Sequence, residues 1–335
     1  MQELRENIAS AITQAREEYL THRIVYQDEK PLVKKNEFLF FIKPEITLPG
    51  RGIQLEKILD FILNKTKAYN LDIRNVKVLA AKYLQKYDII AQHYGVINQI
   101  SRNAKAIISK EGKEKFESLY KCPLDEATVM GSIEFIEKYD TFSPRALDYL
   151  WQNGDMKKLA GGTYVTTLNL DGEEVFLVNG FHPRQLEHFT ASGRSIVTFT
   201  LAGDLDWETA RSSFIGATNP VNAKEGSIRR ELMEKKEEFG LQAINSSWNG
   251  VHLSAGPVEG LVELIRYNSD FETGKILEPN DFDFGKNLAR YFNPAEIEKI
   301  LNNAILEKDG KKMTVFDLTE EQNADEAVVL LKKII

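Results

Sequence analysis

One stretch in the second half of the chain combines residue types that can accept and pass on a phosphate group. Asn249-Gly-Val-His252-Leu-Ser254 places a histidine between an amide and a hydroxyl, and Glu263 follows eleven positions after the histidine. A histidine can attack a terminal phosphate and carry it as a phosphoramidate, provided that a partner fixes its other ring nitrogen. We therefore take His252 as the candidate nucleophile.

Phosphoryl transfer otherwise depends on positioning and on neutralising charge, so basic and hydroxyl side chains are the next group of interest. Arg211, Arg229 and Lys43 are candidate phosphate clamps, and Thr218 is a candidate hydroxyl donor. The planar guanidinium group of arginine can donate hydrogen bonds to two phosphate oxygens at once. Other roles remain open, because both arginines can be solvated helix charges or ion-pair partners and Lys43 can simply end a strand.

Several function classes are disfavoured by what the sequence lacks. It has no GxxxxGK[ST] loop, no three-glycine dinucleotide motif and no cluster of histidines and cysteines with metal-ligand spacing. The formal charge of -7 argues against a nucleic-acid partner. Apolar runs are too short to span a membrane, the first residues lack a secretory pattern, and Cys122 has no second cysteine to pair with. We expect a cytoplasmic protein without membrane contact.

The order of elements predicts an α+β fold. Short apolar runs predict strands at residues 38–42, 73–80 and 195–201 and around 251, while helical periodicity falls on residues between them and on 257–267. Four strands with helices on one face suit a ferredoxin-like βαββαβ sandwich. Asp171-Gly172, between two alternating stretches, predicts a hairpin.

The remaining segments look like additions to that sandwich. Residues 2–28 have apolar positions at near-helical spacing, residues 96–160 are mostly helical, and the tail is helical with one possible short strand at 313–318. The predicted organisation is an N-terminal helical extension (1–36), a first catalytic part (37–95), an insertion of helices plus the hairpin (96–180), a second catalytic part (181–270) and a C-terminal helical extension (271–335).

In these motifs the chain resembles the nucleoside diphosphate kinase family. The residues that carry the resemblance are, in order, Lys43-Pro-Glu45 after the first strand, His93-Tyr94, Gly216-Ala-Thr218-Asn-Pro220, Gly226-Ser-Ile-Arg229, Asn249-Gly-Val-His252-Leu-Ser254 and Glu263. The combination is specific, although no single tripeptide in it would be. The matches occur at both ends of the fold, on either side of the insertion.

The resemblance implies a role for each matching residue. It implies that His252 carries the phosphoryl group, that Glu263 orients it, and that Tyr94 and Ser254 support the site. It assigns a ribose contact to Asn249, and rough alignment puts Phe181 or His182 where the base would stack. It also implies Mg²⁺ bound mainly through the phosphates of nucleoside tri- and diphosphates, with few direct protein ligands, and a possible homo-oligomer.

The neighbourhood of the histidine departs from the family pattern. Where family members usually have His-Gly-Ser-Asp, this chain has His252-Leu-Ser254-Ala-Gly256. Three hypotheses follow. The first is a nucleoside diphosphate kinase that works by a ping-pong mechanism through phosphorylated His252. The second is a nucleotide-binding or sensing module whose chemistry is altered, and the third is transfer from His252 to a non-nucleotide acceptor.

Overall fold

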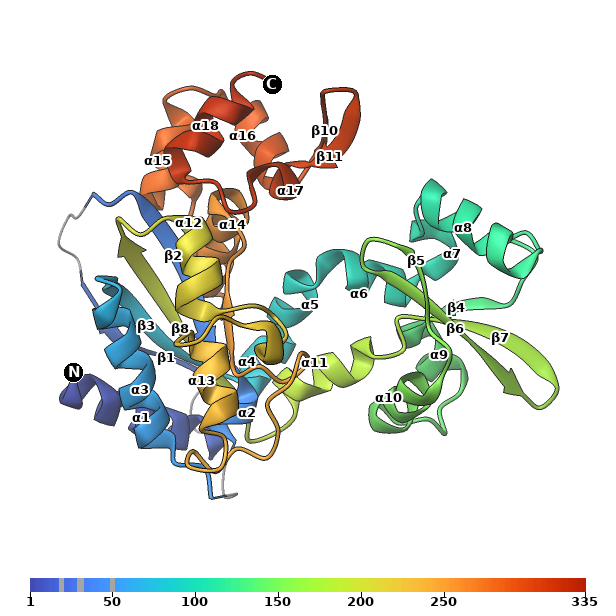
Figure 1. The fold of residues 1–335 in the computed structure, drawn as a ribbon, viewed down its shortest axis with the longest axis horizontal. Coiled ribbons are helices and arrows are strands. Elements are labelled where there is room, and N and C mark those ends of the chain that lie inside the picture. Colours follow the sequence, from blue (N-terminus) through green and yellow to red (C-terminus); the bar gives the residue numbers. More distant parts are fainter. Residues whose placement is uncertain (18–20, 29–32, 49–51) are drawn as a thin grey trace. The chain divides into compact units, whose positions relative to one another are not determined.

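Helices combine with sheets of five, four and two strands in this chain, which is a mixed α+β protein (Figure 1). The structure is a computed structural model that describes residues 1–17, 21–28, 33–48 and 52–335. The chain divides into unit 1, residues Met1–Tyr87 and Ser192–Ile335, and unit 2, residues Asp88–Ala191. The predicted insertion, residues 96–180, lies within unit 2, and all predicted site residues except Tyr94 and His182 lie in unit 1.

A five-stranded antiparallel sheet organises unit 1. Its spatial order is β1-β3-β8-β2-β9. The strands are β1 (His22–Gln27), β2 (Asn36–Ile42), β3 (Asp72–Ala80), β8 (Ser195–Gly203) and β9 (Val251–Leu253). Four of them fall where apolar runs predict strands. Helix α3 (Leu55–Ala68) connects β2 to β3, and α13 (Ile228–Glu234) lies between β8 and β9.

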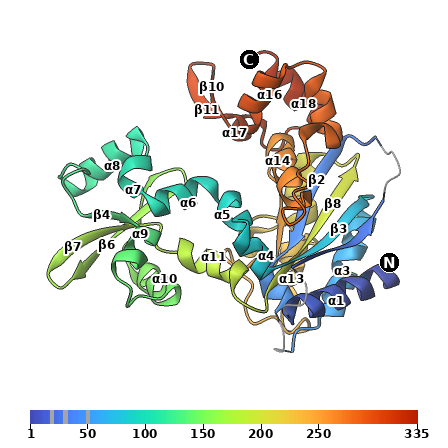
Figure 2. The ribbon, with the colours of Figure 1, turned by 180° about the vertical axis from the view of Figure 1, so that it is seen from behind.

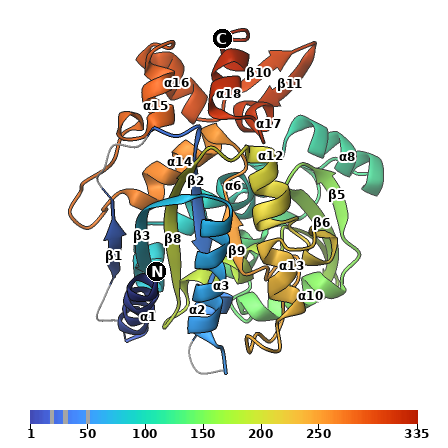
Figure 3. The same ribbon diagram turned by 60° about the vertical axis from the view of Figure 1, so that its left-hand side comes forward.

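Both faces of this sheet are covered, which corrects the expectation of helices on one face. On β2, Phe38, Phe40 and Ile42 belong to the core that also contains residues of α1 (Gln2–Arg16) and α3. Phe41 points to the other face, where its ring lies 5.6 Å from Tyr267 of α14 (Pro257–Asn268). Figure 3 shows α1 and α3 in front of the sheet and α14 behind it. A strand buried on both faces reads as a continuous apolar run, as residues 38–42 do.

The N-terminal extension is not wholly helical. The predicted helix over residues 2–28 ends at Arg16, and β1 pairs with β3 as an additional strand.

The remaining elements of unit 1 between β2 and α14 are short. They are α2 (Pro44–Thr47), α4 (Ala81–Lys86), α12 (Trp207–Thr209), a π-helical segment η1 (Ala210–Ile215) and a 3₁₀ turn η2 (Pro220–Asn222).

The C-terminal segment is helical with one hairpin. Its elements are a 3₁₀ turn η3 (Pro279–Asp281), α15 (Asp283–Ala289), α16 (Pro294–Leu301), β10 (Ile305–Lys308), β11 (Lys311–Thr314), α17 (Val315–Thr319) and α18 (Ala324–Leu331). The short strand predicted at 313–318 ends at Thr314, because the Thr314 side chain accepts the Asp317 N–H and caps α17 there. Figure 2, in which the molecule is seen from behind, shows α17 next to α14.

Unit 2 has its own sheet and its own apolar clusters. The strand order is β4-β7-β6-β5, with β4 (Val129–Gly131) parallel to β7 (Glu173–Val178). The turn between β6 (Thr163–Leu170) and β7 confirms the hairpin, because Asp171 and Gly172 have φ of 51° and 86°. The other elements are β5 (Lys157–Ala160), α5 (Ile89–His93), α6 (Gly95–Arg102), α7 (Ala104–Ile107), α8 (Lys110–Tyr120), α9 (Ser132–Lys138), α10 (Pro144–Asn153) and α11 (His182–Thr190).

Candidate functional site

His252 lies on β9 and faces Glu263 of α14. The His252 Nε2 atom is 3.1 Å from both carboxylate oxygens of Glu263, and the Ser254 hydroxyl donates to Oε2 of the same carboxylate at 2.6 Å. When Nε2 carries the proton and donates it to the carboxylate, Nδ1 is the ring nitrogen with the lone pair. In that tautomer the lone pair of Nδ1 meets the chemical requirement for attack on phosphorus.

The sheet and α14 fix the orientation of this pair. His252 is opposite Phe41 in the β2–β9 ladder, and the two rings stack with centroids 4.5 Å apart. Glu263 is only 2% exposed, on the face of α14 that packs on the sheet. Ser254 is also buried, and its hydroxyl lies 3.3 Å from the Leu39 carbonyl oxygen. Charge-assisted hydrogen bonds between buried groups hold side chains in one geometry.

Lys43 and Asn249 lie together at the end of β2. The Lys43 Nζ atom donates to Oδ1 of Asn249 at 2.7 Å, and the Asn249 amide donates to the Thr218 carbonyl oxygen at 3.0 Å. The pKa of Lys43 is lowered to about 8, mainly by desolvation, with Glu45 opposing the shift and Arg229 contributing to it. The fold thus brings three predicted site residues, Lys43, Asn249 and Thr218, into one hydrogen-bonded chain.

Arg229 ties the loop after η1 to β9. It is buried, and its guanidinium donates to the Gly216 carbonyl oxygen at 2.8 Å and to the Val251 carbonyl oxygen at 3.1 Å. Gly216 has φ of 87°, and a Cβ there would lie 2.3 Å from the Ser227 hydroxyl, so only glycine fits. Arg229 therefore braces the strand that carries His252.

Arg211 is more exposed and contacts acidic residues of the C-terminal segment. Its guanidinium lies 3.4 Å from the Leu253 carbonyl oxygen, 3.4 Å from Glu320 and 3.7 Å from Glu321. These glutamates lie far from Arg211 in the sequence, so no local pattern indicates the contact.

A further carboxyl group, Glu259, lies one turn before Glu263 on α14 and accepts the Ala255 N–H at 3.3 Å. Burial raises its pKa to about 7, the charge of Glu263 adds to the shift, and Arg211 opposes it.

Glu45 was not predicted as a site residue, although it belongs to the Lys-Pro-Glu motif. It accepts the Gly250 N–H at 2.7 Å and so connects that motif to the segment carrying Asn249.

Tyr94 and His182 lie in unit 2. Both ring nitrogens of His182 have partners there, Nδ1 with Gln185 at 3.1 Å and Nε2 with Asn98 at 3.2 Å. Burial lowers the pKa of His182 to about 4. Its ring lies edge-on to Tyr94 at 6.2 Å. Within unit 2, then, His182 has the contacts of a neutral structural histidine.

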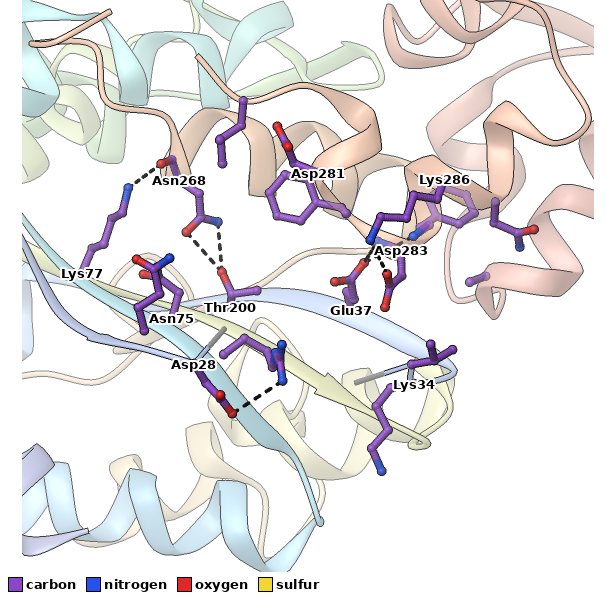
Figure 4. Close-up of a pocket in the computed structure, with 18 of the residues that line it drawn as sticks. Asp28, Lys34, Glu37, Asn75, Lys77, Thr200, Asn268, Asp281, Asp283 and Lys286 are labelled. Atoms are coloured by element: carbon purple, nitrogen blue, oxygen red, sulfur yellow. Dashed lines mark hydrogen bonds and ion pairs between the residues drawn. The ribbon is translucent and has the colours of Figure 1, made fainter. Parts of the chain in front are cut away.

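A cavity of about 940 Å³ lies elsewhere in unit 1, on the side of the sheet where β1, β3 and β8 meet the segment after α14 (Figure 4). Its floor includes Lys77, which donates to the Asn268 carbonyl oxygen, and Thr200, which is hydrogen-bonded to the Asn268 side chain. Desolvation lowers the pKa of Lys77 to about 8. None of the predicted site residues is among the described residues that line this cavity.

Comparisons with known proteins complete the description. No family model matches the sequence, and no curated protein matches it. Among solved structures, an NDP kinase from Pyrobaculum aerophilum matches with a TM-score of 0.33 and 18% identity, over 72% of this chain and 99% of that chain. Within the described residues, no helix has both the length and the apolar character needed to cross a membrane.

Proposed function

We propose that the chain is a nucleoside diphosphate kinase in which His252 carries the phosphoryl group between two nucleotides. The observation that carries the proposal is the contact of the Glu263 carboxylate with both Nε2 of His252 and the Ser254 hydroxyl. The strand order β3-β8-β2-β9, with α3 and α13 as the connecting helices, supports a ferredoxin-like fold for the catalytic part of unit 1.

In the proposed reaction the phosphoryl group is transferred in two steps. Nδ1 of His252 attacks the γ-phosphorus of a nucleoside triphosphate, the bond to the β–γ bridging oxygen breaks, and a nucleoside diphosphate leaves. A terminal phosphate oxygen of a second diphosphate then attacks the phosphorus, the bond between phosphorus and Nδ1 breaks, and a nucleoside triphosphate leaves. The ring returns to its starting state. Glu263 stabilises the positive charge that the ring acquires on phosphorylation.

The basic residues of the site supply the remaining interactions. Lys43 and Arg211 would neutralise phosphate charge, and Asn249 would contact the ribose while it accepts the hydrogen bond from Lys43. Mg²⁺ would be held mainly by the nucleotide phosphates, because the Glu263 carboxylate is hydrogen-bonded to His252 and Ser254. When bound, the ion would neutralise charge on the transferred group.

The proposal is tested by incubating the protein with γ-labelled ATP and Mg²⁺ and then adding unlabelled GDP. The matched variants are His252→Ala and, as a control histidine of unit 1 outside the motif, His22→Gln. Acid-labile, base-stable label is expected on the wild type and on His22→Gln but not on His252→Ala, and GDP should release it as GTP. Label that stays on the protein after GDP is added would indicate that the phosphate acceptor is not a nucleoside diphosphate. ATP binding without any label would indicate a nucleotide-binding module.

A further inference from the structure

The turn after α17 brings two carboxylates against a proposed phosphate-binding residue. Glu320 and Glu321, here called the acidic pair, lie 3.4 Å and 3.7 Å from the Arg211 guanidinium. Glu320 also raises the pKa of Glu259, while Arg211 lowers it. Arg211 therefore lies within a group of acidic side chains that comes from two separate elements, α14 and the turn after α17.

The backbone holds the acidic pair in this position. The Glu321 N–H donates to the Ala255 carbonyl oxygen at 2.9 Å, and Glu321 itself has φ of 59°. Gly256 approaches so closely that a Cβ there would lie 2.5 Å from the Thr319 carbonyl oxygen. The turn is thus fitted to the residues that directly follow His252-Leu-Ser254.

The contacts themselves are loose. Each is longer than the 2.7–2.9 Å of a strong charge-assisted hydrogen bond, and the two carboxylate side chains are 48% and 44% exposed. Exposed ion pairs of this kind are weak and are readily exchanged for another anion. A nucleotide phosphate carries more negative charge and offers several oxygens to the same guanidinium.

We infer that the acidic pair competes with the phosphate groups of a nucleotide for Arg211, so that the C-terminal segment restrains nucleotide binding at this site. The inference rests on the proposed function and adds a regulatory contact to it. In the unbound protein the acidic pair holds Arg211, and the phosphate group displaces the carboxylates when it binds. Because all of these groups are at least partly exposed, the competition weakens as salt screens the charges.

The experiment measures the dissociation constant of MgADP by calorimetry, since ADP cannot phosphorylate His252. Glu320→Gln/Glu321→Gln should bind MgADP about two- to tenfold more tightly than the wild type at low salt. The matched control is Glu298→Gln/Glu307→Gln, which removes two exposed carboxylates from the same C-terminal segment. Its affinity should equal that of the wild type, and circular dichroism should show that all variants are folded.

A second comparison tests whether the acidic pair acts through Arg211. In an Arg211→Gln background, removing the acidic pair should leave the MgADP affinity unchanged. An effect that persists there, or wild-type affinity in Glu320→Gln/Glu321→Gln, overturns the inference while leaving the proposed function intact. If MgADP binds neither to the wild type nor to any variant, the proposed function is overturned and the inference with it.

Discussion

The Glu263 carboxylate contacts two side chains at once, His252 and Ser254. Replacing it with the neutral amide in Glu263→Gln keeps the shape but removes the charge that stabilises the phosphorylated ring. Hydrogen bonds to charged groups contribute about 1.5–3 kcal/mol. We therefore expect the rate of His252 phosphorylation to fall by about 10- to 100-fold, measured by rapid-quench labelling with γ-labelled ATP.

Ser254→Ala is a milder substitution whose phosphorylation rate can be compared with that of Glu263→Gln. It removes the hydroxyl that donates to Oε2 but leaves the contact between Glu263 and His252 in place. A decrease of only a few-fold is expected. Phosphorylation of Glu263→Gln at the wild-type rate would show that the carboxylate does not act on the histidine during the reaction.

We expect Lys43 to make nucleotide binding dependent on pH. Desolvation and the nearby Arg229 lower its pKa to about 8, and only the protonated amine attracts phosphate. The charged fraction therefore falls as pH rises through 8, and the dissociation constant of MgADP should increase about tenfold between pH 7 and pH 9. Lys43→Arg keeps its charge over this range, so calorimetric titrations of that variant should show a much flatter profile. Equal slopes for the two proteins would exclude Lys43 as the titrating group.

Residue type and order predicted side chains that the structure brings into contact. Lys43, Asn249, His252, Ser254 and Glu263 belong to short motifs, and the structure brings Lys43 to Asn249 and joins the other three through one carboxylate. The acidic pair could not be predicted, because the contact depends on how the C-terminal segment folds back onto α14. The nucleotide-binding role of each residue stays a prediction.

At the level of elements, strong apolar runs and turn residues correctly predicted strands and a hairpin turn. Residues 38–42 are buried on both faces in β2, and Asp171-Gly172 forms the hairpin turn. The sequence did not predict β1, the six-residue edge strand His22–Gln27. Buried and exposed residues do not alternate along this strand, so the usual strand pattern is lacking. A short, partly exposed edge strand owes its structure to pairing with β3, which local sequence does not reveal.

The packing of α17 against the start of α14 leads to a prediction of its own. At Gly256 an added Cβ would lie 2.5 Å from the Thr319 carbonyl oxygen, and backbone atoms cannot move aside cheaply. We expect Gly256→Ala to lower the free energy of unfolding by about 1–3 kcal/mol, measured by urea denaturation. It should also weaken the contact between Arg211 and the acidic pair by displacing the turn.

Gly161→Ala is the matched control for that substitution. A Cβ at Gly161 meets no atom within 4 Å, and this glycine has no left-handed φ. Its stability should stay within about 0.5 kcal/mol of the wild type. Equal stability of Gly256→Ala and Gly161→Ala would mean that the turn at Thr319 is not packed on α14 in solution.

At the scale of the whole molecule, three apolar clusters of described residues each lie within one unit. One core contains only residues of unit 1, and two further clusters contain only residues of unit 2. The two segments of unit 1 that flank unit 2 are paired near their ends, since Ala80 pairs with Ser195 and the Ala81 N–H donates to the Arg194 carbonyl oxygen at 2.8 Å. A short connection can therefore replace unit 2 without stretching the sheet of unit 1.

We expect a chain in which residues 88–191 are replaced by a short Gly-Ser linker to unfold cooperatively, because every residue of the core that contains Phe38, Phe40 and Ile42 lies in unit 1. It should still acquire acid-labile label from γ-labelled ATP, since Lys43, Arg211, His252 and Glu263 all lie in unit 1. A folded shortened chain that takes up no label, while the full chain does, would show that unit 2 supplies a group that phosphorylation requires.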